Sequence, residues 1–484
     1  MTHHHSRRNF LRNASQGIGA LAVGSLVGRG GIFSTLEAAQ LASNPYVDPL
    51  ALKAPHFAPR AKSIIWLHMI GAPATQDLFD YKPELYKLHG QVVPDSFLKG
   101  IQTSTQGGVG KLLASKRTWK QYGESGAWFS DWLPHLAQRA DELAFIKSSV
   151  TIGATHDISV LKLNTGALTP GRPSLGAWIQ YALGSANRDL PAYIVLSNGG
   201  RGLEGGSVNY CSGFLPAVYQ GIPIQLGDSP ILFLERPELM SAAQQRSDLD
   251  LLKRFNQHRA KAYPDDTEVR ARIEAYELAA RMQATVPGVV DLAKESDETR
   301  KLYGIGEEAT NDYGTNLLRA RRLVENGVRF VQVVSGAAGE EKDWDAHDYL
   351  EENHTAQARM VDKPVAALLA DLKARGLLDS TLVVWTAEFG RTSYGQSGSG
   401  RDHNPWGYTQ WMAGAGVKAG TSYGETDAIG LQNADESKAV DTYDLHATVL
   451  ERIGLDHLKT IYLHEGRSER PTVVYGKVVR ELLG

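Results

Sequence analysis

The amino-acid sequence predicts an α/β protein in which a mostly parallel central sheet lies between layers of helices. Short β-branched apolar runs, typical of strands buried on both faces, recur along the chain. Longer segments between them repeat apolar residues at helical spacing, as residues 361–372 do between the runs 328–334 and 381–385. Because a strand, a helix and a second strand form a parallel crossover, both runs are expected to end at the same edge of the sheet.

Residues 1–39 have the features of an export signal. The twin arginines Arg7 and Arg8 precede a Gly- and Ala-rich stretch, residues 17–27, that is too short and too weakly apolar to span a bilayer. We interpret residues 1–39 as a twin-arginine signal peptide, cleaved near Ala38 or Ala39. The alternative is an N-terminal arm in which the two arginines occur by chance. The interpretation predicts a periplasmic or extracellular protein carried by the twin-arginine export machinery.

Composition indicates the domain layout beyond residue 39 and excludes several kinds of protein. Residues 40–59 are rich in proline and irregular, which predicts a linker, and residues 60–484 are expected to form the folded domain. With 51 Lys and Arg against 54 Asp and Glu, the chain has no basic excess that would indicate a nucleic-acid partner. No later segment is long and apolar enough to span a membrane. Cys211 is the only cysteine, so an internal disulfide is excluded.

The remaining elements are predicted from local patterns. Strands are predicted at 63–67, 144–146 and 192–196, and a strand of small residues at 412–417. Residues 230–330 have mostly helical patterns and are expected to cover the sheet. A further helix opens near Asp444, which, or an adjacent residue, is expected to be the N-cap.

Carboxylates and histidines lie just after the ends of several predicted strands. Since parallel strands present their carboxyl ends at one edge, the loops after 328–334 and 381–385 are expected to face the same crevice. Mixed oxygen and nitrogen donors suit zinc, manganese or iron better than calcium. The sequence therefore predicts a divalent-metal site with these candidate ligands: Asp77, Asp343, Asp345, His347, Glu388 and His403.

Each candidate also has a simpler interpretation. Asp77 would cap a helix, Asp343 and Asp345 would lie in a solvated loop, and His403 would be an exposed loop histidine. Arg391 is expected to bind a sulfate or phosphate group, because a guanidinium donates two parallel hydrogen bonds to such an anion. Its alternative role is an ion pair that holds the loop, for example with Glu388.

Several segments resemble the alkaline phosphatase and sulfatase superfamily. Residues 381–391 resemble its TLVVFTSDHGE segment, residues 412–420 its GPGxxxG strand, and residues 444–454 its DLxPTxLxLxG stretch. The chain from about residue 60 to 484 is similar to a family of secreted, sulfatase-like bacterial proteins without an assigned function (domain of unknown function 1501). The resemblance implies an alkaline-phosphatase-like fold. It also implies that Asp77, Glu388 and His403 are metal ligands, together with Asp343 and His347 or, in place of Asp343, Asp345.

Two positions depart from the superfamily pattern. Phe389 stands where DHG has its histidine, and His156 stands where a sulfatase has its nucleophilic cysteine. Thr155 or Ser159 would replace that nucleophile only under a shifted alignment. The departures favour attack by metal-activated water, with His156 as base or ligand.

Two functions are therefore considered. The first is an exported, metal-dependent hydrolase of sulfate or phosphate esters, acting on a small anionic ester or a sulfated or phosphorylated glycan. The alternative is a non-catalytic descendant of the same fold that binds an anionic glycan or a partner protein.

Overall fold

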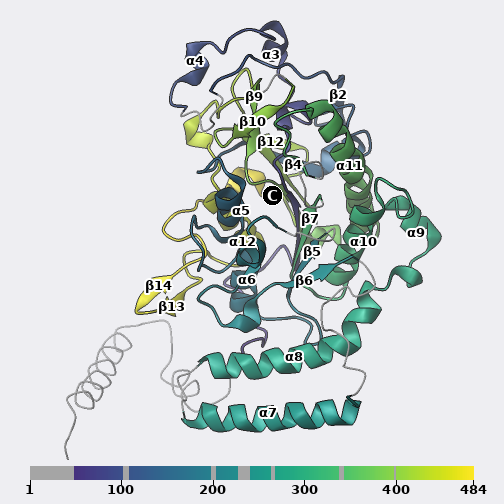
Figure 1. Cartoon of the computed structure of the whole chain (residues 1–484), viewed down its shortest axis with the longest axis vertical. Coiled ribbons are helices and arrows are strands. Elements are labelled where there is room, and N and C mark those ends of the chain that lie inside the picture. The colour runs from purple at the N-terminus through teal and green to yellow at the C-terminus, as the bar shows by residue number, and fades with distance from the viewer. Residues whose placement is uncertain are drawn as a thin grey trace, which may run out of the picture.

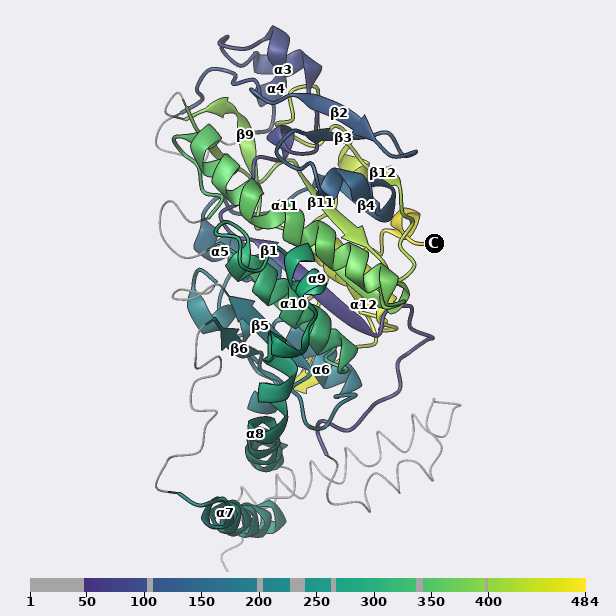
Figure 2. The ribbon, with the colours of Figure 1, turned by 90° about the vertical axis from the view of Figure 1, so that its right-hand side faces the viewer.

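The computed structural model describes residues 48–101, 108–197, 203–226, 240–262, 267–336, 343–396 and 399–484. The predicted signal peptide, residues 1–39, lies outside this range, as do residues 40–47 of the predicted linker. In the described part, an eight-stranded sheet with the order β12-β4-β11-β8-β1-β7-β5-β6 lies between two layers of helices (Figures 1 and 2). This architecture confirms the predicted α/β fold class.

The sheet is parallel except at one strand. β1 pairs in parallel with both β7 and β8, β5 pairs in parallel with β7 and β6, and β12 pairs in parallel with β4, whereas β11 runs antiparallel to β8 and β4. The strand bounds are β1 Ser63–Met69, β4 Leu143–Ser149, β5 Tyr193–Ser197, β6 Ile222–Gln225, β7 Phe330–Ser335, β8 Thr381–Thr386, β11 Tyr408–Ala413 and β12 Thr421–Tyr423. Three small hairpins complete the strands: β2 Trp119–Tyr122 with β3 Ala127–Ser130, β9 Gly390–Gly395 with β10 Arg401–Asn404, and β13 Tyr462–His464 with β14 Arg467–Glu469.

Helices cover both faces of the sheet. One layer contains α10 (Asn311–Glu325) and α11 (Leu350–Ala374), and the other contains α5 (His156–Thr165), α6 (Leu175–Leu183) and α12 (Thr442–Arg452) (Figure 1). α8 (Thr267–Val290) packs against α10, and α7 (Ala242–Ala262) packs against α8. The short helices are α3 Pro83–Lys87, α4 Asp95–Leu98 and α9 Asp297–Leu302. None of the helices in the described ranges is both long enough and apolar enough to cross a bilayer.

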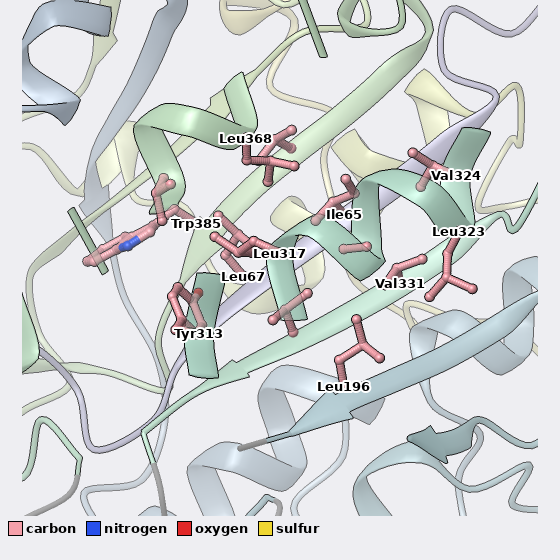
Figure 3. Close-up of a cluster of buried hydrophobic side chains, with 14 of the residues drawn as sticks. Ile65, Leu67, Leu196, Tyr313, Leu317, Leu323, Val324, Val331, Leu368 and Trp385 are labelled. Atoms are coloured by element: carbon pink, nitrogen blue, oxygen red, sulfur yellow. The ribbon is translucent and has the colours of Figure 1, made fainter. Parts of the chain in front are cut away.

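The alternating side chains of the buried strands explain the two layers. In β1, Ile65 and Leu67 belong to the core under α10 and α11, whereas Ile64 and Trp66 belong to the core on the opposite face. Figure 3 shows the first of these cores, where Leu317 and other side chains from the helices pack on the strands. Burying both faces of the strands is what makes their sequences continuously apolar.

Two local predictions are corrected. The strand expected at 412–417 instead spans Tyr408–Ala413 (β11). It ends there because the next residues, Gly414 and Ala415, adopt positive φ values of 78° and 46°. The N-cap of α12 is Asp441 rather than Asp444. Asp444 is the N3 partner in a capping box, so both carboxylates satisfy backbone N–H groups at the start of the helix.

Candidate metal centre

The candidate site lies beyond the carboxyl ends of β1, β7 and β8. The loop after β7 supplies Asp345 and His347, and the β9–β10 hairpin supplies Arg391 and His403, which face each other in its register. Helix α5 begins with His156. The two loops that were expected to face each other lie at the same edge of the sheet, because the parallel pairing of β1 with β7 and β8 aligns the strand ends.

Four side chains converge on one point. The ligand atoms of His156, Asp345, His347 and His403 all lie within 4.8 Å of one another. The His347 Nε2 atom is 2.9 Å from His403 Nε2 and 3.0 Å from Asp345 Oδ1. His403 Nε2 lies 3.4 Å from Asp345 Oδ1, and His156 Nε2 lies 3.3 Å from Asp345 Oδ2. Three imidazoles and one carboxylate therefore surround a common space.

The Nδ1–H groups of two of these imidazoles, His347 and His403, point away from that space. His403 Nδ1 lies 2.6 Å from the Ala154 carbonyl oxygen, and His347 Nδ1 contacts Gln396 Oε1. Since these oxygens only accept hydrogen bonds, each Nδ1 is the donor, and each neutral ring keeps its lone pair on Nε2. The interior then contains two nitrogen lone pairs beside a carboxylate, an arrangement that a cation would stabilise.

Charges around the cluster keep its carboxylate ionised. Burial alone would raise the pKa of Asp345, but the Arg391 guanidinium and the neighbouring histidines hold it well below its usual range. Burial opposes protonation of His156, yet hydrogen bonding and ion pairing with Asp345 and Glu388 raise its pKa to about 10. Burial, with a contribution from Arg391, lowers the pKa of His403 to about 4. A negative carboxylate beside a neutral imidazole favours binding of a positive ion.

The cluster is open on one side. The side chains of His347 and Asp345 are 36% and 29% exposed, whereas those of His403 and His156 are 10% and 11% exposed. An ion or a substrate would therefore approach from the side of His347.

Arg391 is not placed to receive an anion. Its side chain is fully buried, and Nη2 donates to Asp345 Oδ1 at 2.5 Å and to the Gly71 carbonyl oxygen. Nε donates to Ala72 O at 2.9 Å, and Nη1 to Arg401 O at 3.3 Å. In this structure Arg391 forms an ion pair with Asp345 rather than the one suggested with Glu388.

Asp77 and Asp343 also lie outside the converging group. Asp77 accepts hydrogen bonds from Arg401 Nε at 2.7 Å and Nη2 at 3.3 Å, and both side chains are almost completely buried. Asp343 Oδ1 accepts the backbone N–H of Asp345 at 2.9 Å, and burial raises the pKa of Asp343 to about 6. Asp77 therefore holds Arg401 of β10, Asp343 shapes the loop that carries Asp345, and neither carboxylate belongs to the converging group.

Glu388 contacts the Nδ1 atom of His156, whereas Nε2 of the same ring faces Asp345. Oε1 lies 2.7 Å from His156 Nδ1 and accepts the Gly71 N–H at 2.9 Å, and Oε2 lies 3.2 Å from His68 Nε2. Burial opposes its ionisation, but hydrogen bonds with His156 and His68 hold the pKa of Glu388 below its usual range. His68 was missed from the sequence because the predicted strand stopped at Leu67. The available signal was a histidine among apolar residues at the strand end.

The side chain of Phe389 packs against two of the imidazoles. Its fully buried ring lies 4.9 Å from the ring centre of His156 and 4.5 Å from that of His403. At the position where the superfamily segment has a histidine, this chain therefore has an aromatic side chain that restricts the orientation of both rings.

A buried polar chain anchors the helix that begins with His156. Gln332 Nε2 on β7 donates to Asn164 Oδ1 on α5 at 2.8 Å, and Tyr193 OH on β5 donates to Gln332 Oε1 at 2.9 Å. These bonds fix α5 against the sheet. Of the alternative nucleophiles, Thr155 is exposed and Ser159 is buried behind the start of the helix.

Comparisons with known proteins give one family match. Among solved structures, a sulfatase from Pseudoalteromonas sp. shares 13% identity at a TM-score of 0.36, covering 82% of this chain and 68% of that one. A phosphonate monoester hydrolase from Silicibacter pomeroyi shares 13% identity at 0.35, covering 72% and 71%. An alkaline phosphatase from the Antarctic bacterium TAB5 shares 11% at 0.35, covering 84% and 99%. No curated protein matches in sequence. Residues 61–483 match the model described as "Protein of unknown function (DUF1501)", and the chain belongs to that family.

Proposed function

We propose that the protein is an exported, metal-dependent hydrolase of sulfate or phosphate esters. The observation that carries the proposal is the convergence of His347 Nε2, His403 Nε2 and the Asp345 carboxylate, with the Nδ1 protons of both histidines directed outward. This donor set fits zinc, manganese or iron. The resemblance of residues 381–391 to the sulfatase and phosphatase superfamily supports the ester class.

Asp345, His347 and His403 are the ligands in this proposal. Three protein ligands leave a coordination position open, as in catalytic metal sites. When bound, a divalent ion would polarise an ester oxygen, lower the pKa of a water molecule and disfavour the charged form of the adjacent His156. Arg391 keeps the Asp345 carboxylate in place throughout.

His156 is the general base in this proposal. Its Nε2 accepts a proton from the water that attacks the sulfur or phosphorus atom. The bond from that atom to the leaving alcohol oxygen breaks, and the proton passes from His156 to the departing oxygen. No side-chain nucleophile is required, which agrees with a histidine at the position where a sulfatase has its cysteine.

The proposal is tested by elemental analysis of protein exported with its own signal. We expect near-stoichiometric zinc, manganese or iron in the wild type, and loss of the ion in His347→Ala and His403→Ala. His258→Ala, an exposed histidine on α7, is the matched control and should retain the ion. Hydrolysis of p-nitrophenyl sulfate or phosphate should disappear with the ion. A metal-free wild type would overturn the proposal.

A second candidate function is binding without catalysis. The observation that favours it is the fourth donor: if His156 also ligates, four protein ligands close the coordination sphere, as in structural sites. The variant His156→Ala distinguishes the hydrolase from the non-catalytic binding protein. If His156→Ala retains the ion but loses hydrolysis, the result supports His156 as the general base. If the wild type hydrolyses neither ester and His156→Ala loses the ion, the site is structural. That result supports a protein that binds an anionic glycan or a partner protein.

A further inference from the structure

Glu388 is the centre of a chain of three buried side chains. His68 and Glu388 are fully buried and joined through Nε2 and Oε2 at 3.2 Å, and the other carboxylate oxygen lies 2.7 Å from His156 Nδ1. The Gly71 backbone N–H donates to that same oxygen at 2.9 Å. Each oxygen of Glu388 is therefore directed at a separate imidazole.

This chain determines which nitrogen of His156 faces the site. An ionised carboxylate can only accept, so His156 Nδ1 is the donor and the lone pair of the neutral ring lies on Nε2. Nε2 of His156 is buried and lies 3.3 Å from Asp345 Oδ2, so it faces the carboxylate of the candidate site. Without Glu388, the ring would be free to adopt the other tautomer and to turn away from Asp345.

His68 occupies a position where an apolar side chain would fit the sheet. It lies on β1 between Val334 of β7 and Thr386 of β8. Its Nδ1 is buried and has no hydrogen-bond partner in the described ranges, which makes this histidine costly in a core strand. A histidine at this position does, however, place its Nε2 in contact with Glu388.

We propose that His68 and Glu388 are positioning residues that hold His156 with Nε2 directed at the reacting groups, and that Glu388 is not a metal ligand. The inference rests on the proposed function for the role of His156. It assigns a use to His68 and gives Glu388 a role different from the one that the superfamily pattern implies. A carboxylate behind a histidine fixes both the ring orientation and the tautomer.

The test compares Glu388→Gln with Glu388→Leu. The Gly71 N–H favours the amide oxygen of glutamine at the Oε1 position, where it still accepts from His156 Nδ1, whereas leucine accepts nothing. We expect both variants to retain the wild-type metal content. In Glu388→Leu, kcat for p-nitrophenyl sulfate or phosphate should fall about 10- to 100-fold with little change in KM, and glutamine should restore part of it.

The tautomer of His156 provides a readout that does not need turnover. Nitrogen NMR of zinc-loaded, histidine-labelled protein, in which the ion disfavours the charged form of His156, should show its Nδ1–H form in the wild type and in Glu388→Gln, and a mixture of tautomers in Glu388→Leu. The resonances are assigned with His156→Asn. His68→Leu should shift the same equilibrium while sparing the Glu388–Gly71 contact. Glu352→Gln, an exposed carboxylate on α11, is the control.

The outcomes separate the two proposals. Loss of metal in a folded Glu388→Leu protein, or an unchanged tautomer in both Glu388→Leu and His68→Leu, would overturn the positioning role. A wild type that hydrolyses neither ester would contradict the proposed function, yet the NMR comparison would still decide whether Glu388 and His68 position His156.

Discussion

At the scale of single residues, the candidate site combines contacts that were predictable with contacts that were not. Asp345, His347 and His403 meet because parallel strands end at one edge, a consequence of topology that sequence patterns reveal. Asp77 pairs with Arg401, 324 residues away in sequence, and Arg391 pairs with Asp345, 46 residues away. Arg391 also donates to backbone carbonyls such as that of Ala72, and no local spacing encodes such pairings. Residue types therefore predicted the centre of the cluster better than its periphery.

Asp77 gives a direct test at this scale. Because Arg401 is completely buried, Asp77→Asn would leave its charge without a compensating carboxylate. We expect the free energy of unfolding to fall by about 3–5 kcal/mol, measured by urea denaturation. Metal content, by elemental analysis, should remain at the wild-type value. Loss of the ion in folded Asp77→Asn would restore Asp77 as a ligand. Asp131→Asn, on an exposed carboxylate, is the control.

Phe389 gives a second test. Phe389→Leu keeps an apolar side chain but removes the ring that contacts His156 and His403. With the imidazoles less restricted, we expect metal affinity to weaken several-fold, measured by competition with a chromogenic chelator. Phe97→Leu changes a half-buried phenylalanine in a different core and should leave the affinity unchanged. An unaltered affinity in Phe389→Leu would show that the ring does not orient the ligands.

At the scale of elements, the contacts that join helices to the rest of the fold make stability depend on pH. Asp362 on α11 accepts the backbone N–H groups of Leu136 and His135, at the start of the 3-10 helix Leu136–Glu142. Burial raises the pKa of Asp362 to about 6, although these hydrogen bonds lower it. The folded protein therefore binds this proton more readily than the unfolded chain does.

Protonation of Asp362 accordingly stabilises the folded protein in mild acid. Between about pH 6 and pH 4, this residue's contribution raises the free energy of unfolding as the pH falls. Asp362→Asn lacks that contribution. Urea denaturation across this range should show the wild type gaining stability relative to the variant at lower pH. Parallel pH profiles for the two proteins would contradict the assignment.

At the scale of the whole molecule, the sheet and its helical layers were predictable because both faces of the strands are apolar. The alternation in β1 and the crossover from β7 through α11 to β8 are consequences of that pattern. The antiparallel β11 was not predicted, since its pairing depends on β4 and β8 rather than on its own sequence. The proposed function uses one edge of this sheet, where four charged or imidazole side chains converge.

The most direct test of a metal centre at this edge is X-ray absorption spectroscopy of the metal bound to protein exported with its own signal. We predict a first shell of nitrogen and oxygen alone, at about 2.0–2.2 Å for zinc. Outer-shell scattering from at least two imidazoles should be present, and the signal of the bound metal should disappear in His347→Ala. A bound metal without imidazole scattering, or no bound metal, would contradict a centre built from Asp345, His347 and His403.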